Sequence, residues 1–132
     1  MTERKRTSIL VVEDEPAVAQ VVKGRLELEG YDVHLAATGA AALSHAAEHQ
    51  TNLVILDLRL PDMSGLQVAR HLRKMSSPWE LPIVMLTANH EPVTQLYGFA
   101  HGADAYLTKP YNPVELVQTV RLCLGETVGN RG

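Results

Sequence analysis

Short apolar runs alternate along this chain with longer segments whose apolar residues recur every three or four positions. The runs are four or five residues long and rich in Val, Ile and Leu, which is typical of strands buried on both faces of a parallel sheet. They predict five strands, at 8–12, 33–36, 53–57, 83–86 and 105–108. The run at 33–36 is the most polar, so we expect it at an edge of the sheet.

The segments between these runs carry helix signals. Pro16 suits a first helical turn, Thr38 and Asn112 are good capping residues, and glycines follow several of the periodic segments. Five helices are predicted, at about 15–29, 38–50, 64–77, 89–102 and 112–124. The first helix is expected to bury one apolar face, made of Val18, Val21, Val22 and Leu26.

The alternation of strands and helices indicates βαβ units with right-handed crossovers. The sequence therefore predicts an α/β fold with a doubly wound, five-stranded parallel sheet and five helices. A chain of 132 residues suffices for one such domain. We place the domain at 8–124, between tails at 1–7 and 125–132.

Composition narrows the class of protein. Apolar residues make up 45% of the chain and charged residues 20%, which is ordinary for a soluble globular protein. No apolar run approaches the ~20 residues that span a bilayer, and a net charge of -3 gives no general attraction to nucleic acid. The single cysteine, Cys123, cannot form an internal disulfide and is expected on the apolar side of the last helix. These features predict a cytoplasmic protein.

Four of the apolar runs end in polar residues that phosphoryl chemistry uses. They are followed or closed by Glu13 and Asp14, by Asp57, by Thr87–Ala88 and by Lys109. In an open α/β sheet, ligands bind outside the carboxyl ends of the strands. We therefore expect three carboxylates, a hydroxyl and an ammonium at one edge of the sheet.

The acidic residues point to a metal ion. Glu13, Asp14 and Asp57 would bring up to three negative charges together, which is costly unless a cation or protons neutralise them. Oxygen ligands that leave room for water and phosphate suit Mg²⁺ (or Mn²⁺) better than Ca²⁺. A solvated acidic helix start at Glu13–Glu15 is the simpler alternative, but it explains neither Asp57 nor Lys109.

The order, spacing and flanking residues of these motifs resemble the receiver domain of bacterial two-component response regulators, over about residues 8–124. That domain is a phosphorylatable signalling switch. The resemblance implies a flavodoxin-like sheet with the strand order 2-1-3-4-5. It also implies that Asp57 accepts a phosphoryl group from a histidine kinase or a histidine phosphotransfer protein. Such a domain is not an enzyme, since it catalyses only its own phosphorylation and slow dephosphorylation.

The resemblance assigns roles around Asp57. The metal ligands would be Asp14, Asp57 and the backbone carbonyl of Arg59, with Glu13 acting mainly through water. The peptide bond between Lys109 and Pro110 would be cis and would aim the ammonium inward.

The resemblance also implies a switch. The Thr87 hydroxyl and the Ala88 N–H would bind phosphoryl oxygens, and the movement of Thr87 would let the Tyr106 ring turn toward the core. The surface of 89–102, 105–108 and 112–124 would then change for a downstream protein partner or effector domain. Arg59 and Asn89 are expected to tune dephosphorylation from the mouth of the pocket.

Three other functions fit parts of the pattern. An Mg²⁺-dependent phosphatase of the haloacid dehalogenase type also uses an aspartyl nucleophile. It needs a second Asp two residues later as a general acid, where this chain has Arg59. A flavodoxin-like FMN carrier would need a Ser/Thr/Gly-rich loop where this chain has Glu13–Glu15. A phosphate-independent interaction module would not need the pocket residues, all of which are present.

Six histidines raise the question of a second metal site. His45 and His49 have the i, i+4 spacing of metal ligands on a helix. The sequence shows no third ligand near them, and we expect water to cover that helix face. The others are expected on exposed or edge positions, at His34, His71, His90 and His101.

Overall fold

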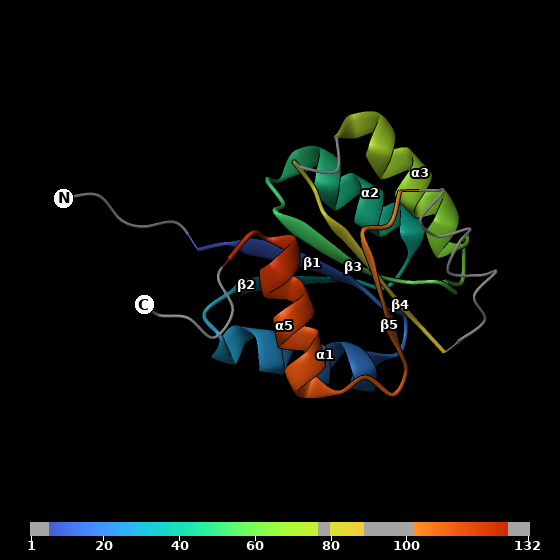
Figure 1. Ribbon diagram of the computed structural model, residues 1–132. Coiled ribbons are helices and arrows are strands. Elements are labelled where there is room, and N and C mark those ends of the chain that lie inside the picture. The colour runs from blue at the N-terminus through green and yellow to red at the C-terminus, as the bar shows by residue number, and fades with distance from the viewer. Residues whose placement is uncertain (1–5, 77–79, 89–101, 127–132) are drawn as a thin grey trace.

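The computed structural model describes residues 6–76, 80–88 and 102–126 of the chain. These residues form one parallel sheet with the strand order β2-β1-β3-β4-β5, as Figure 1 shows. The strands are β1 (Ser8–Val12), β2 (Asp32–Ala36), β3 (Leu53–Asp57), β4 (Ile83–Thr87) and β5 (Ala105–Thr108). All five predicted strands are confirmed, and β2 lies at an edge as expected.

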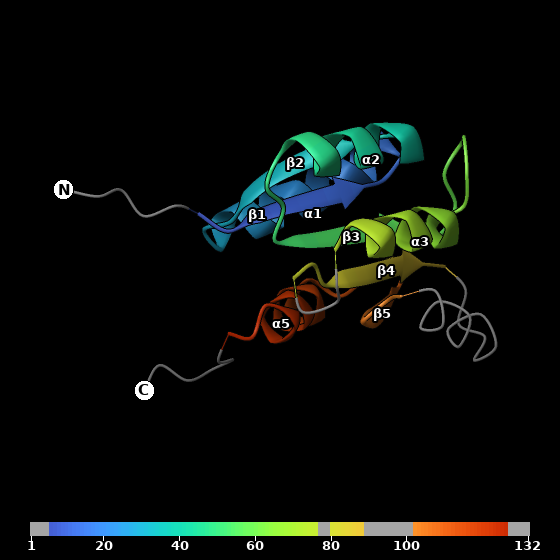
Figure 2. The same cartoon turned by 90° about the horizontal axis from the view of Figure 1, so that it is seen from above.

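Helices cover both faces of the sheet. They are α1 (Pro16–Leu28), α2 (Gly39–Glu48), α3 (Gly65–Met75) and α5 (Pro113–Cys123). α1 and α5 lie on one face and α2 and α3 on the other (Figures 1 and 2). The fold is therefore the predicted flavodoxin-like one, with four helices rather than five in the part that the structure describes. The helix predicted at 89–102 lies outside that part except for its last residue, Gly102.

None of these described helices has the length and apolar character needed to cross a membrane.

The sheet separates two apolar layers, and this explains the unbroken apolar runs. Ile9 and Val11 of β1 belong to the layer under α1 and α5, whereas Leu10 and Val12 belong to the layer under α2 and α3. All four side chains are at most 1% exposed. Since full burial of such a side chain contributes about 1.5–3 kcal/mol, both faces of each central strand stabilise the fold.

One predicted core position in α1 is wrong. The helix buries Ala19, Val22 and Leu26, but Val21 is 61% exposed. Adjacent helical residues are turned by about 100° from each other, so Val22 faces the sheet and Val21 faces solvent. Cys123 packs against the layer under α1 and α5, as predicted.

The start of α2 is capped twice, once from its own sequence and once from a distant loop. The Thr38 hydroxyl accepts a hydrogen bond from the Ala41 N–H at 3.0 Å. The Asp62 carboxylate, in the β3–α3 loop, accepts from the N–H groups of Gly39 and Ala40 at 2.8 and 2.9 Å. These bonds lower the pKa of Asp62. The loop that follows Asp57 is thereby attached to α2.

Arg73 attaches the far end of α3 to β4 and β5. Its guanidinium donates to the carbonyl oxygens of Leu81 at 2.7 Å and Gly102 at 2.6 and 3.0 Å, and to the Asp104 carboxylate at 2.7 Å. The same Asp104 oxygen accepts from the Ile83 N–H at 2.8 Å. The Arg73 side chain is only 15% exposed. One side chain thus joins three elements at the edge opposite the strands' carboxyl ends.

Candidate functional site

The carboxyl ends of four strands meet at one edge of the sheet, and each carries a predicted site residue. β3 and β4 are in register with Asp57 opposite Leu86, and Thr87 of β4 is opposite Thr108 of β5. Lys109 follows directly and donates its backbone N–H to the Thr87 carbonyl at 2.7 Å. Thr87, which carries the predicted hydroxyl, and Lys109, which carries the predicted ammonium, are therefore held side by side by a backbone hydrogen bond.

Three carboxylates converge there, as the sequence predicted. Glu13, Asp14 and Asp57 each offer an oxygen, and these oxygens lie within 4.8 Å of one another. Glu13 is 3% and Asp57 is 7% exposed, while Asp14 is exposed. Among the residues that the structure describes, this is the one group of three such ligand atoms that already lie this close together.

Lys109 enters this cluster from the end of β5. Its Nζ lies 2.8 Å from a Glu13 oxygen, 3.2 Å from an Asp57 oxygen and 3.8 Å from a Glu15 oxygen. The peptide bond between Lys109 and Pro110 is cis. Burial acts to lower the pKa of Lys109, but its contacts with Glu13 and Asp57 outweigh burial and hold that pKa above its ordinary value. The side chain is therefore a cation at neutral pH.

Glu13 is the most buried acid of the cluster and contacts Lys109 directly. Its other oxygen accepts a hydrogen bond from the Glu15 N–H at 3.1 Å. Burial raises the pKa of Glu13, and the negative charge of Asp57 adds to this, while the contact with Lys109 opposes it. Direct pairing with Lys109 is a role that the sequence analysis had not assigned to Glu13.

The charges at this edge do not balance. Glu13, Asp14, Glu15 and Asp57 offer four carboxylates, and Lys109 is the one cation that contacts them in the described part of the chain. A site with excess negative charge and only oxygen donors fits a hard divalent cation such as Mg²⁺. The donor set is therefore compatible with the predicted metal ion.

The turn after β3 holds Asp57 in position. The Arg59 N–H donates to an Asp57 carboxylate oxygen at 3.3 Å, and the Gly65 N–H donates to the Leu58 carbonyl at 2.7 Å. A Cβ atom at Gly65 would overlap the backbone oxygen of Asp57. Only glycine lets α3 approach the strand this closely, so the absence of a side chain there helps to fix the Asp57 backbone.

The residues expected to form the switch lie on adjacent strands. Thr87 is 3% exposed and is followed by the exposed Ala88. Tyr106 of β5 is partly buried and packs against the layer under α2 and α3, and burial raises its pKa. The ring therefore already contacts the core on one side. Asn89 lies outside the described residues.

Comparison with known protein families and curated proteins agrees with the resemblance seen in the sequence. A family model described as "Response regulator receiver domain" matches residues 9–121. The chain is 40% identical over 119 residues to the transcriptional regulatory protein SrrA of Staphylococcus aureus, covering 90% of this chain and 48% of that protein. It is 39% identical over 119 residues to the DNA-binding dual master transcriptional regulator RpaA of Synechocystis, covering 90% of this chain and 49% of the relative. The chain thus spans about half the length of these curated relatives.

Solved structures show the same likeness. A CheY-like response regulator receiver domain protein from Methanospirillum hungatei superposes with a TM-score of 0.86 at 32% identity, covering 92% of this chain and 95% of that one. The chemotaxis response regulator CheY4 of Vibrio cholerae superposes with a TM-score of 0.85 at 33% identity, covering 90% of this chain and 99% of the other.

Proposed function

Because this chain belongs to the family of response-regulator receiver domains, we propose that it accepts a phosphoryl group on the Asp57 carboxylate. The donor is a histidine kinase or a histidine phosphotransfer protein. Receiver domains are phosphoacceptor switches rather than conventional enzymes. The observation that carries the proposal is the position of Asp57, which is 3.2 Å from the Lys109 ammonium and within an acidic cluster that fits a divalent cation.

In the proposed reaction, an Asp57 oxygen attacks the phosphorus of a phosphohistidine. The new O–P bond forms an acyl phosphate as the P–N bond breaks, and the imidazole leaves with the electron pair. Transfer of this kind depends on positioning and on stabilisation of charge at the equatorial oxygens. The Lys109 ammonium supplies part of that stabilisation, while the Thr87 hydroxyl and the Ala88 N–H bind oxygens.

Asp14, Asp57 and the Arg59 carbonyl, with Glu13 close by, are the groups that would hold Mg²⁺ (or Mn²⁺). The bound ion supplies charge neutralisation for the phosphoryl oxygens.

The phosphatase alternative requires a carboxylic acid two residues after the nucleophile. That residue is Arg59, whose backbone N–H donates to the Asp57 carboxylate and whose side chain is a guanidinium. A group that cannot give up a proton at neutral pH cannot serve as the general acid. Because no general acid stands at that position, we expect a long-lived acyl phosphate rather than rapid turnover of phosphate esters.

The first test is chemical. Incubation with a small phosphodonor and Mg²⁺ is expected to add one phosphoryl group, detected by mass spectrometry as an acid-stable, base-labile adduct. A chelator should prevent its formation, because the acidic cluster cannot hold the incoming dianion without a second cation. Restoring Mg²⁺ should restore labelling. Equal labelling with and without chelator would contradict the proposed metal dependence.

Phosphorylation is expected to change the environment of Tyr106. The phosphoryl group draws the Thr87 hydroxyl toward it, and the space vacated beside β5 admits the aromatic ring. A hydrogen bond to a charged acceptor contributes roughly 1.5–3 kcal/mol, enough to shift a balanced population about tenfold or more. The surface of β5 and α5 then presents a changed face to a downstream partner or effector domain, and residues 89–101, which were predicted to share this face, lie outside the described residues.

NMR of the Tyr106 ring with and without beryllofluoride, a phosphate mimic, measures this switch. The signals are expected to move in the native protein and to stay in place in Thr87→Ala. An unchanged ring in the beryllofluoride-bound native protein would show that Tyr106 is static.

The lifetime of the adduct is expected to depend on Arg59. Its backbone N–H donates to Asp57 and the residue is exposed, which supports a side chain that can cover or pair with the phosphoryl group. Arg59→Ala should shorten the phosphoryl half-life, measured by loss of the adduct over time, because water then reaches the phosphorus more easily. Arg70→Ala, an exposed change on α3, is the control. Equal half-lives for the native protein and Arg59→Ala would remove Arg59 from this role.

A further inference from the structure

Three histidines that are separate in the sequence form one cluster in the structure. His45 and His49 lie on and directly after α2, with ring centroids 4.5 Å apart and an interplanar angle of 24°. His34 comes from β2, and its ring centroid lies 4.9 Å from that of His45. The sequence shows no third ligand near His45 and His49, but the structure places His34 beside His45, because β2 packs under α2.

We propose that His34, His45 and His49 bind a divalent transition-metal ion of the class that prefers imidazole, such as Zn²⁺. Imidazole nitrogens suit Zn²⁺, Cu²⁺ and Ni²⁺ better than the hard ions that fit the Asp57 cluster. His49 is the residue that follows α2, and its N–H still donates to the His45 carbonyl at 2.9 Å, which keeps the two imidazoles side by side. A third imidazole from a neighbouring strand completes a three-nitrogen set and leaves a coordination position for water.

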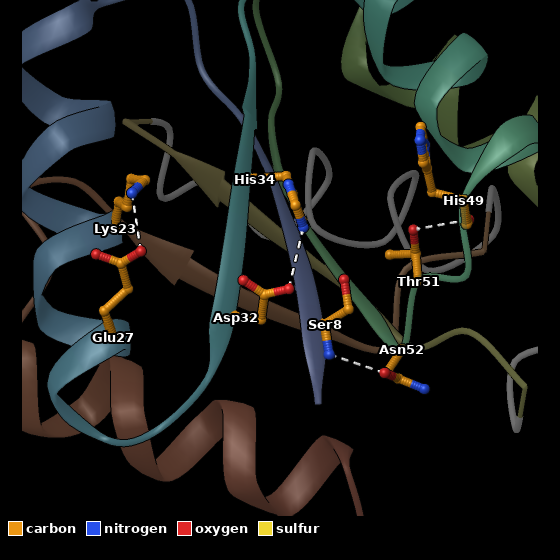
Figure 3. A network of polar contacts seen from close by, with 8 residues as sticks. All are labelled: Ser8, Lys23, Glu27, Asp32, His34, His49, Thr51 and Asn52. Atoms are coloured by element: carbon orange, nitrogen blue, oxygen red, sulfur yellow. Dashed lines mark hydrogen bonds and ion pairs between the residues drawn. The ribbon is translucent and has the colours of Figure 1, made fainter. Parts of the chain in front are cut away.

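The partner of His34 is the kind of group that orients a metal ligand. Its Nε2 lies 3.3 Å from an Asp32 carboxylate oxygen, as Figure 3 shows. A carboxylate only accepts hydrogen bonds, so Nε2 of His34 is the donor in this contact. Metal-binding histidines commonly donate their other N–H to a carboxylate in this way.

His45 has a nitrogen that lacks a partner. Its Nε2 is buried and makes no hydrogen bond within the described structure. Burial lowers the pKa of His45, and the rings of His49 and His34 lower it further. A buried polar atom without a partner is costly, and a bound cation would satisfy it.

The rings must turn to converge on one ion. In the structure His45 and His49 stack rather than point at a common centre. His49 is exposed, so rotation of its ring about the Cβ–Cγ bond meets little resistance. Asp32, His34 and His49 line a cavity of about 440 Å³ that has room for an ion and its water, and the His45 ring has to turn toward it. This site is independent of Asp57 and of the proposed function.

Calorimetric titration with Zn²⁺ in excess Mg²⁺, which is added to compete for the acidic cluster, tests the proposal. One Zn²⁺ per chain is expected to bind the native protein. Affinity should fall by at least about tenfold in His45→Gln and His49→Gln, and by roughly 10- to 100-fold in Asp32→Asn. His71→Gln, an exposed histidine on α3, should bind as the native protein does.

NMR of the imidazole signals gives a second readout, in which His34, His45 and His49 shift together on addition of Zn²⁺. Because His49 is exposed, His49→Gln keeps the fold and separates lost binding from lost structure. Native-like affinity in both His45→Gln and His49→Gln, or no saturable binding to the native protein, would overturn the proposal.

Discussion

Asp57→Asn is expected to abolish phosphoryl labelling completely. An amide oxygen lacks the negative charge that makes the carboxylate a nucleophile, and no other described carboxylate combines burial, contact with Lys109 and a place beside Thr87. Glu13 is also buried and contacts Lys109. It follows β1, however, and its two carboxylate oxygens already contact Lys109 and the Glu15 N–H. Labelling is measured by mass spectrometry after incubation with a small phosphodonor and Mg²⁺.

The fold should survive this change. Asparagine has nearly the same shape as aspartate, and its amide oxygen can still accept the Arg59 N–H that now reaches Asp57. The variant also removes one of the converging negative charges, whose mutual repulsion it relieves. Asp32→Asn, which changes an exposed carboxylate on the edge strand, is the matched control and should label normally. A persistent adduct in Asp57→Asn would assign the phosphoryl group to another residue.

Arg73→Ala is expected to lower the free energy of unfolding by about 3 kcal/mol. The guanidinium makes charge-assisted bonds to two carbonyl oxygens and to Asp104, and bonds to charged groups contribute about 1.5–3 kcal/mol each without full additivity. Removal leaves the carbonyls of Leu81 and Gly102 without this donor and Asp104 without its counter-charge. The loss is large against a total of about 5–15 kcal/mol for a typical domain.

Urea unfolding measures this effect, and two variants on the same helix calibrate it. Arg73→Lys should lose part of the stability, since a single ammonium cannot reproduce the planar fork that serves three partners. Arg70→Ala, on the exposed side of α3, should change stability by about 0.5 kcal/mol or less. Equal midpoints for Arg73→Ala and Arg70→Ala would show that the network adds no stability.

The sequence predicted the parts of the molecule that local patterns determine. The strands were visible because Ile9–Val12 and the similar runs are buried on two faces, which removes polar residues from them. The convergence of Glu13, Asp14 and Asp57 followed from strand ends alone, since parallel strands bring their carboxyl ends to one edge. The caps at Thr38 and Asn112 are local signals and are also present.

Contacts between distant side chains were not visible in the sequence. The Arg73 network joins residues of three elements, and no periodicity marks Arg73 or Asp104 as partners. His34 and His45 are in contact because of the way in which β2 packs under α2. The pairing of Glu13 with Lys109 depends on the direction in which a long side chain crosses the strand ends. These features are decided by packing and not by local sequence.

The strand order has a consequence for how the chain folds during synthesis. β1 lies between β2 and β3 in the sheet. The two strands whose ends carry Glu13, Asp14 and Asp57 can therefore pair before the rest of the chain has been synthesised. Lys109 follows Asp57 by 52 residues, a delay of roughly 3 to 10 seconds at ribosomal rates of about 5–20 residues per second. The acidic cluster therefore forms before its ammonium is made, and the arrival of β5 at the sheet edge completes the core and adds the first positive charge to the pocket in one step.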